Sequence, residues 1–239
     1  MKKMLFVLLL LTLAVPTSIS ALGQDEGALL DRVLGVYPDV TKEQLLTEID
    51  SASRVTKQPR EAILNQMYTE LRTKMVEPQM SIASSGDKGN GAYQLASSSK
   101  GDVFFETAST IGIPHGHVGI YYTPDFIVES VPSTGVRKVK LIDKRVDSGS
   151  KILTLKKEYA SSAARSAAAD WANTRIGEKY SYNFATNRLT SCSGDKNCSK
   201  LVWCSFKEKA NIDIDQDGGL GVYPIDIRDS SMFITLKSY

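Results

Sequence analysis

The sequence predicts an α+β domain over residues 101–239, preceded by a helical region, and three observations support this fold class. From Gly101 onward, short segments rich in β-branched and aromatic residues are separated by turn residues, as in an antiparallel sheet. An alanine-rich segment and a second segment that starts near Cys198 have the composition and spacing of helices. Because the strands are gathered before these helices, we expect an antiparallel sheet packed on helices.

The individual elements of this domain follow from the same patterns. The predicted strands are DVFFET at 102–107, HVGIYY at 117–122, FIVESV at 126–131, VRKVKLI at 136–142 and KILTLK at 151–156. The first helix is predicted over 159–177, where Gly177 is a typical C-terminal cap. The second helix is predicted to begin at Cys198, because the preceding Asn197 is a favoured N-cap residue.

Residues 22–80 are predicted to be helical. Thr41 and Gln44 fit a capping box, and Pro59 stands where a second periodic segment begins. Residues 81–100 are rich in serine and glycine and are expected to form a linker. The expected organisation is therefore a helical N-terminal extension, a linker and a sheet-containing domain, at residues 22–80, 81–100 and 101–239.

Residues 1–21 have the pattern of a secretory signal peptide. Two lysines precede an apolar run, and small residues follow it. The run is shorter than the roughly twenty apolar residues of a membrane-spanning helix. We therefore expect cleavage and export to the cell envelope, with no stable membrane insertion afterwards.

The charge of the chain gives little reason to expect an anionic polymer as partner. Removing Lys2 and Lys3 brings the formal net charge of +2 to about zero, which argues against nucleic acid. A basic run between Arg137 and Lys157 is interpreted as a solvated surface. The mature chain is expected to be a monomer.

Three cysteines, an odd number, leave at least one thiol unpaired within the chain. Cys198 is predicted on the first turn of a helix, where free backbone N–H groups and the helix dipole favour an anion. Such a thiol should have a lowered pKa and act as a nucleophile. Cys204 is interpreted as a small buried residue, and Cys192 could be free or paired with either of the others.

A nucleophilic thiol needs a base, and the chain offers only His115 and His117. His117 opens a predicted strand of a hairpin. If residues 123–125 form a three-residue turn, Gly119 pairs with Glu129, and His117 and Glu129 become diagonal neighbours on one face. The glycine leaves room between them. A two-residue turn would instead direct Glu129 to the other face, and an exposed edge-strand carboxylate is the alternative interpretation.

Six segments, in order along the chain, resemble one enzyme family: GDVFF at 101–105, HVGIYY at 117–122, IVES at 127–130, GEKYSYNF at 177–184, CSKLVW at 198–203 and YPIDIRDSSMF at 223–233. They are similar to the permuted papain-like amidases of the YaeF/YiiX type, within the NlpC peptidase superfamily. The resemblance covers about residues 100–239. It implies a circularly permuted papain-like fold, in which the histidine strand precedes the cysteine helix.

The same resemblance implies roles for single residues. Cys198 is the nucleophile, His117 the base and Glu129 the residue that orients the base. Tyr180 matches an aromatic that lines the site and helps to hold the oxyanion, with simple packing as the alternative. Lys200 stands where relatives often carry an acidic residue, which bears on specificity and leaves the catalytic set intact. No cofactor and no metal are expected.

We therefore expect a secreted cysteine hydrolase that cleaves amide bonds through a thioester, with cell-wall peptides or peptidoglycan as substrate. One alternative is an acyltransferase that acts on lipid with the same three residues. A second is a non-catalytic wall-binding module. A third is a metal protein that uses His115 and His117, although a His-x-His pair without a third ligand is weak evidence.

Two further motifs have simple interpretations. DIDQDGG at 213–219 imitates the start of a calcium loop, but its twelfth position is Pro224 where that loop needs a bidentate glutamate. A polar turn is the preferred interpretation. Glu70, in AILNQMYTE, faintly resembles the catalytic glutamate helix of lysozyme-like transglycosylases. The rest of that lobe is missing, so an exposed helix glutamate is preferred.

Overall fold

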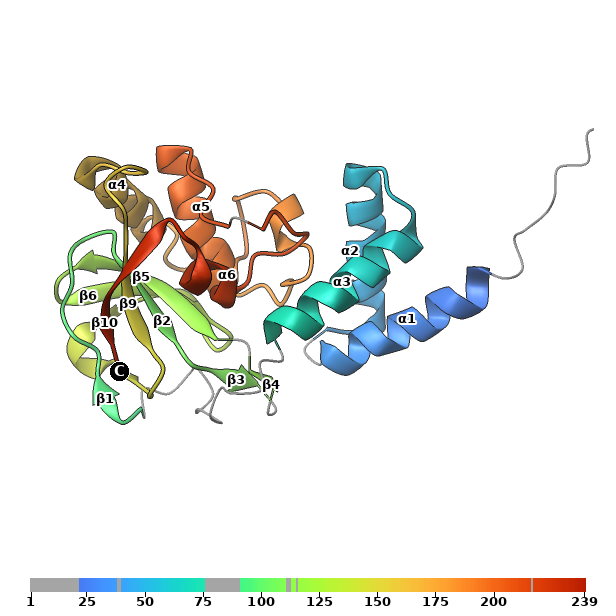
Figure 1. Cartoon of the computed structure of the whole chain (residues 1–239), viewed down its shortest axis with the longest axis horizontal. Coiled ribbons are helices and arrows are strands. Elements are labelled where there is room, and N and C mark those ends of the chain that lie inside the picture. Colours follow the sequence, from blue (N-terminus) through green and yellow to red (C-terminus); the bar gives the residue numbers. More distant parts are fainter. Residues whose placement is uncertain (1–21, 38–39, 76–90, 111–112, 115, 216) are drawn as a thin grey trace, which may run out of the picture.

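The structure is a computed structural model, and it describes residues 22–37, 40–75, 91–110, 113–114, 116–215 and 217–239. Figure 1 shows a group of helices at one end and a sheet covered by further helices at the other. The predicted signal peptide and residues 81–90 of the predicted linker lie outside the described residues. None of the described helices is long and apolar enough to cross a bilayer.

The N-terminal region is helical, as predicted. Its described helices are α1 (Leu22–Val36), α2 (Lys42–Thr56) and α3 (Arg60–Met75). The expected capping box starts α2: Gln44 N donates to the Thr41 hydroxyl, and the Gln44 side chain accepts from Thr41 N. The apolar residues of these helices belong to the same buried cluster as the core beneath the neighbouring sheet. The three helices are therefore packed on the rest of the chain.

The main sheet has six strands within the described residues, in the order β10-β9-β2-β5-β6-β7, and each neighbouring pair is antiparallel. In chain order these strands are β2 (Val103–Glu106), β5 (His117–Thr123), β6 (Phe126–Val131), β7 (Gly135–Lys140), β9 (Lys151–Leu155) and β10 (Phe233–Ser238). Two short pairs join β1 (Tyr93–Gln94) to β8 (Arg145–Val146) and β3 (Ser109–Thr110) to β4 (Ile113–Pro114). The five predicted strand segments are thus confirmed.

Helices follow the five predicted strands, in line with the α+β prediction, and β10, which was not predicted, returns to the sheet after them. The helices are α4 (Ser162–Asn173), α5 (Cys198–Ala210) and α6 (Pro224–Asp229), and short 3-10 turns occur at η1 (Leu141–Asp143) and η2 (Asn187–Leu189). Helix α5 starts where it was predicted to start. Helix α4 ends at Asn173, before the predicted cap Gly177, whose backbone N–H donates to Val136 of β7.

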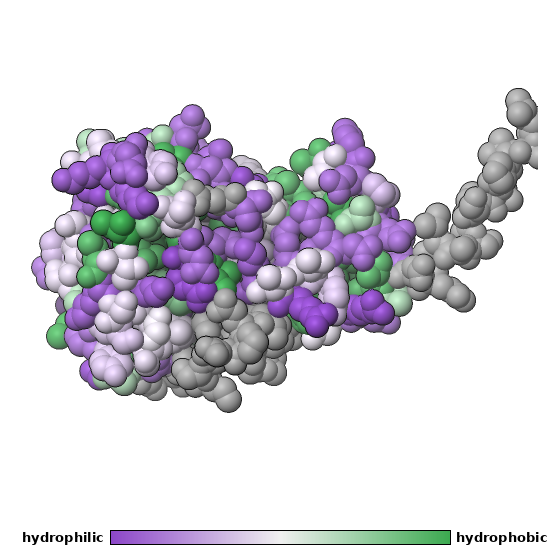
Figure 2. Space-filling view, in the orientation of Figure 1, coloured by the Kyte–Doolittle hydropathy of each residue, from purple (hydrophilic) through white to green (hydrophobic). Residues whose placement is uncertain are grey.

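The two faces of the sheet are covered differently. Alternate residues of β5, Val118 and Ile120, join the large cluster beneath α4 and α5, whereas Tyr121 joins a smaller cluster on the other face. Leu95 is buried in this smaller cluster. Residues 91–100 of the predicted linker therefore pack against the sheet domain and extend it toward the N-terminus. On the face drawn in Figure 2, hydrophilic residues predominate and hydrophobic surface is scattered.

Candidate active site

Cys198 is the first residue of α5, and the residue before it caps the helix. The Asn197 side chain accepts a hydrogen bond of 2.9 Å from Lys200 N, and it donates one of 2.8 Å to the Asn183 carbonyl oxygen. The thiol is free and Cys198 is only 3% exposed. The helix packs on β5 and β6. The sulfur is therefore held at a helix start against the strands that carry the candidate base and carboxylate.

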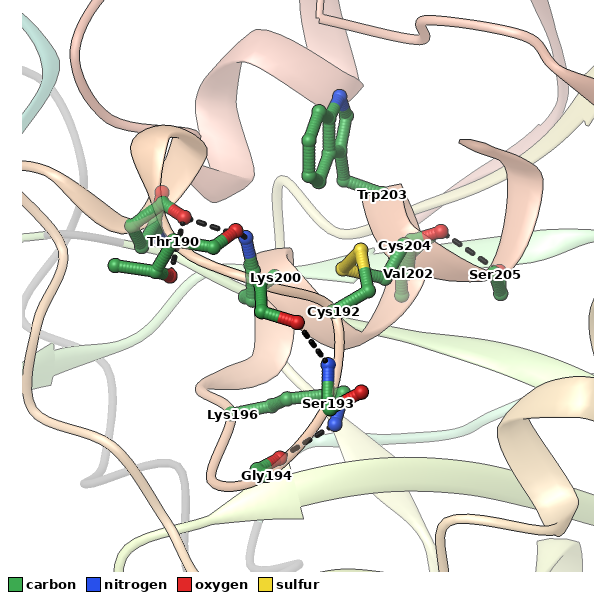
Figure 3. The surroundings of a disulfide bond; sticks show 12 residues. Thr190, Cys192, Ser193, Gly194, Lys196, Lys200, Val202, Trp203, Cys204 and Ser205 are labelled. Carbon is green, nitrogen blue, oxygen red and sulfur yellow. Dashed lines mark hydrogen bonds between the residues drawn. A yellow bond between two sulfur atoms is a disulfide. The ribbon is translucent and has the colours of Figure 1, made fainter. Parts of the chain in front are cut away.

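The other two cysteines form a disulfide, Cys192–Cys204, shown in Figure 3. Cys204 is fully buried, as predicted, but its interpretation as a simple packing residue is wrong. The bond ties the loop before α5 to the middle of that helix. Among the three cysteines, which the structure describes, Cys198 alone keeps its thiol. The disulfide thus leaves the candidate nucleophile unpaired and restrains the segment in front of it.

Lys200 also holds this segment. Its ammonium group donates to the backbone oxygens of Asn187 and Thr190 (Figure 3). Burial, together with the charges of Lys196 and Arg188, lowers the pKa of Lys200 to about 8. The lysine at this position therefore joins the loop to the helix by hydrogen bonds, an arrangement that an acidic side chain could not make with carbonyl oxygens.

The hairpin β5–β6 brings His117 and Glu129 together, as predicted, with Gly119 directly opposite Glu129. The predicted three-residue turn is wrong. Thr123 pairs with Phe126, which leaves a two-residue turn, and Tyr122 is an extra residue where the register shifts. Such a bulge restores the parity that the shorter turn would have reversed. His117 Nε2 lies 2.9 Å from Oε2 of Glu129, which is fully buried.

The imidazole of His117 is hydrogen-bonded to Glu129, and Cys198 lies close enough to act on the ring by charge and by hydrogen bonding. Because Glu129 engages Nε2, the sulfur is left with Nδ1 as its partner on the ring. Burial lowers the pKa of His117, but the charge and hydrogen bond of Cys198 and those of Glu129 outweigh it and raise this pKa to about 9. The surroundings therefore favour the imidazolium form of His117.

Two cations face the other side of Glu129. Arg137 donates from Nε and Nη2 to Oε1, at 2.9 and 2.7 Å, and Lys144 Nζ lies 3.2 Å from Oε2. Burial alone would raise the pKa of Glu129, but Lys144, His117 and Arg137 together hold it well below its usual range. Glu129 is therefore an ionised carboxylate in the protein interior, which is stable only because it is paired.

Arg137 and Lys144 depart from the interpretation of the basic run as a solvated surface, and sequence reasoning missed both. Lys138, Lys140, Arg145 and Lys157 of the same run are exposed, as interpreted. Arg137 had a detectable signal, because the hairpin β6–β7 places it directly opposite Glu129. Lys144 had none, since it reaches the site only through the η1 turn. Its ammonium also lies 2.6 Å from Glu106, and the two carboxylates raise the pKa of Lys144 although burial lowers it.

Tyr180 lies in the segment that precedes the disulfide loop. Its ring packs against Tyr182 and Phe184, with centroids 5.1 and 6.5 Å apart, and it is partly buried against the core. Asn183 of the same segment receives the hydrogen bond from Asn197 described above. The structure therefore places Tyr180 in a chain segment that contacts the cap of the nucleophile helix, and its packing role is evident.

The sequence suggested two possible metal sites, the His115–His117 pair and the DIDQDGG segment. His115 lies outside the described residues, while the His117 ring is engaged by Glu129 and Cys198. In the DIDQDGG segment, Asp215 pairs with Arg188, and its carboxylate lies within 4.8 Å of those of Asp217 and Asp226. Lys74 of α3 bridges the latter two, at 2.6 Å each. Cationic side chains of the protein thus neutralise this cluster, in line with a polar turn.

Gly119 is needed because a ring lies beneath it. A Cβ atom there would lie 2.5 Å from Phe104 Cε1 and 2.8 Å from the Val128 oxygen, and the Phe104 ring packs against His117 with centroids 5.7 Å apart. We expect Gly119→Ala to lower the free energy of unfolding by about 1–3 kcal/mol, through overpacking. Urea unfolding followed by circular dichroism measures this.

Gly27→Ala is the matched control, because nothing lies within 4 Å of a Cβ atom at that exposed helical position. It should be neutral or stabilise by up to about 1 kcal/mol, since alanine is the better helix former. Equal urea midpoints for Gly119→Ala and the wild type would show that the Phe104 ring moves aside without loss of stability, which would contradict tight packing at Gly119.

A thiol at a helix start, an imidazole on a neighbouring strand and a buried carboxylate behind the ring are the working parts of papain-like thiol enzymes, recognised by geometry and not by chain order. Here the strand precedes the helix, as in a permuted version of that fold. The chain belongs to the family described as permuted papain-like amidase enzyme, YaeF/YiiX, C92, whose family model matches residues 98–233. The predicted family and the α+β, permuted papain-like fold are thereby confirmed.

The chain is also similar to two individual proteins. The chain is 40% identical over 215 residues to the uncharacterized protein YycO of Bacillus subtilis (strain 168). This match covers 87% of the present chain and 85% of YycO. A solved structure, that of the metalloprotein YiiX from Escherichia coli O157:H7, matches with a TM-score of 0.44 and 14% identity. This match covers 62% of the present chain and 99% of the other.

Proposed function

We propose that this chain is a cysteine hydrolase that cleaves amide bonds, with Cys198 as nucleophile, His117 as base and Glu129 as the residue that orients the base. One observation carries the proposal: the His117 ring is hydrogen-bonded to the buried carboxylate of Glu129 and interacts with the free, buried thiol of Cys198. A nucleophile, a base within hydrogen-bonding reach and a third group that fixes the base are the parts that covalent catalysis requires.

The acylation half of the reaction follows from these positions. His117 takes the thiol proton, and the Cys198 sulfur adds to the substrate carbonyl carbon. The resulting oxyanion accepts a hydrogen bond from the backbone N–H of Cys198, since the first N–H groups of a helix have no partner within it. We assign the Tyr180 hydroxyl as a second donor. When the C–N bond breaks, the imidazolium returns its proton to the leaving amine, and a thioester remains on Cys198.

Deacylation uses the same groups in reverse. His117 removes a proton from water, and the oxygen adds to the thioester carbon. The C–S bond then breaks, the acid is released and the proton restores the Cys198 thiol. Throughout both halves Glu129 stays ionised and stabilises each imidazolium, while Arg137 and Lys144 keep its carboxylate in one orientation.

For the substrate we propose a peptide of the bacterial cell wall, met outside the cytoplasm. The support is the secretory pattern of residues 1–21 and the membership of an amidase family. An amidase that is exported meets peptidoglycan peptides as its most abundant amide substrate, and this step is an argument by analogy between family members.

Digestion of purified wall muropeptides by the wild type and by Cys198→Ser, read by mass spectrometry, tests this proposal. New fragments that carry one added water, formed by the wild type alone, are expected. Transfer of a labelled acyl chain from phospholipid to Cys198, with no peptide fragment, would replace the proposal by the acyltransferase alternative. Binding to wall material without either product would replace it by the binding module.

The pH dependence of the amidase reaction should report the titration of His117. Only the imidazolium can protonate a leaving amine, and the pKa of His117 is raised to about 9. We therefore expect kcat/KM for an amide to fall about tenfold per pH unit above pH about 9, and Glu129→Gln to move this decline to lower pH. A constant kcat/KM up to pH 10, with the fold intact by circular dichroism, would exclude His117 as the acid.

A further inference from the structure

Besides the ion pairs of Lys74, two side chains of the N-terminal region bond to backbone groups in loops of the sheet domain, and the first is Tyr37, which follows α1. Its hydroxyl donates to the Tyr182 carbonyl oxygen and accepts from the Phe184 backbone N–H. Asn183, between these two residues, is the partner of the Asn197 side chain, at 2.8 Å. A single buried hydroxyl thus fixes both peptide groups that flank the residue holding the helix cap.

The second contact is made by Glu70 of α3. Its carboxylate accepts from the backbone N–H groups of Leu220, at 2.9 and 3.1 Å, and Gly221, at 3.1 Å. The interpretation of Glu70 as an exposed glutamate is therefore wrong. Burial raises its pKa, and these hydrogen bonds offset part of that rise. A Cβ atom at Gly219 would lie 2.8 Å from the carboxylate, so the loop and the side chain fit closely.

The loop that Glu70 holds contacts the start of α5. Val222, the next residue, accepts from the Ser199 hydroxyl at 2.6 Å and from Asn187 Nδ2 at 3.1 Å, and its own N–H donates to Asn187 Oδ1 at 2.7 Å. Asn187 Nδ2 also lies 3.3 Å from Asn197 Oδ1. The Tyr37 and Glu70 contacts therefore both end on the hydrogen bonds around Asn197, the residue before Cys198.

We propose that the N-terminal helical region is a positioning element of the active site, with Tyr37 and Glu70 as its positioning residues. They fix the loops at 182–184 and 220–222, these loops fix Asn197, and Asn197 fixes the direction in which the Cys198 sulfur and backbone N–H point. The inference rests on the proposed role of Cys198 as nucleophile. A misplacement of about 1 Å, even from a distant change, can lower a rate about 100-fold.

The full-length variants Tyr37→Phe and Glu70→Gln test the proposal, each with a control in the same helical region. Tyr68→Phe removes a hydroxyl from a partly buried ring of α3, and Glu43→Gln neutralises an exposed glutamate of α2. Tyr37→Phe and Glu70→Gln should lower kcat about tenfold, with KM changed by less than about twofold. Their rates of Cys198 alkylation by iodoacetamide should fall in parallel, because the nucleophile itself is misdirected.

Gly219→Ala provides a second test of the Glu70 contact, because the added methyl group displaces the carboxylate without changing it. Its effect on the alkylation rate should match that of Glu70→Gln, and the double variant should be no worse than either single one, as for two changes in one interaction. Control-like kcat and alkylation rates for Tyr37→Phe and Glu70→Gln, corrected for the folded fraction, would overturn the proposal.

These measurements separate the inference from the proposed function. Alkylation needs no substrate, so it reports the positioning of Cys198 even if no amide substrate is cleaved. An inactive wild type with the predicted alkylation pattern would refute the amidase and retain the positioning element. An active wild type, together with unchanged alkylation rates and kcat in Tyr37→Phe and Glu70→Gln, would support the amidase and refute the positioning element.

Discussion

Replacing Cys198 with serine is expected to lower kcat/KM for an amide substrate by about 10⁴-fold or more, because single losses within a triad reach this range. A serine hydroxyl is a far weaker acid than a thiol, so His117 would remove its proton much less readily. The fold should be retained, since serine keeps the shape of the buried side chain. Initial rates on a synthetic wall peptide and a thermal melt measure both effects.

The same helix offers a matched control for this substitution. Ser205 is also buried. Among the described residues its hydroxyl donates only to the Val202 oxygen of the same helix, at 2.7 Å. Ser205→Ala should leave kcat/KM within about threefold of the wild type, since substitutions outside the reacting groups act mainly on stability. Substantial hydrolysis by Cys198→Ser would show that the thiol is not the nucleophile.

The second large effect is expected for Glu129→Gln, which should lower kcat/KM by about 10²–10⁴-fold, the range in which removing the orienting carboxylate of a triad falls. A neutral amide cannot stabilise the His117 imidazolium and can present its NH₂ group to the ring. It also leaves Arg137 and Lys144 without the anion they now share. Breaking a buried ion pair from one side costs about 3–5 kcal/mol, so the melting temperature should fall as well.

Glu106→Gln separates the catalytic effect from the loss of buried charge. Glu106 is buried and pairs with the same Lys144, at 2.6 Å, but Glu129 is the residue hydrogen-bonded to the imidazole. We expect Glu106→Gln to destabilise the protein while kcat/KM of the folded fraction changes by less than about tenfold. If the two variants lost the same activity per folded molecule, Glu129 would have no special role as the orienting residue.

Local sequence patterns were sufficient for the elements that carry the site. Asn197 predicts a helix that starts at Cys198, because an N-cap is a property of adjacent residues. Alternation along β5 and β6 allows His117 and Glu129 to share a face, but whether they do depends on the turn between the strands, and a three-residue turn was needed for the prediction. The turn between these strands was predicted wrongly, and the pairing of Gly119 with Glu129 was still right because the Tyr122 bulge compensates for the shorter turn.

Such local patterns could not predict contacts between segments that are distant in the chain. Nothing near Lys144 in the sequence indicates that its ammonium is buried between two glutamates, and Glu70 meets Leu220 across 150 positions of chain. The choice of Cys192 as the partner of Cys204 was open for the same reason. Each of these contacts depends on how the sheet, helices and loops pack in three dimensions.

The sequence by itself determined the identities and local placement of the reacting groups: a thiol at a helix start, and an imidazole and a carboxylate on paired strands. These depend on interactions between residues a few positions apart or in one hairpin, where spacing fixes geometry. Only the tertiary structure decided what surrounds them: the cations that keep Glu129 ionised, the disulfide that leaves Cys198 free and the N-terminal helices that hold its cap. Burial and long-range pairing depend on the complete packed chain. Charge interactions and hydrogen bonds are stronger where the surrounding protein excludes water and lowers the local dielectric constant.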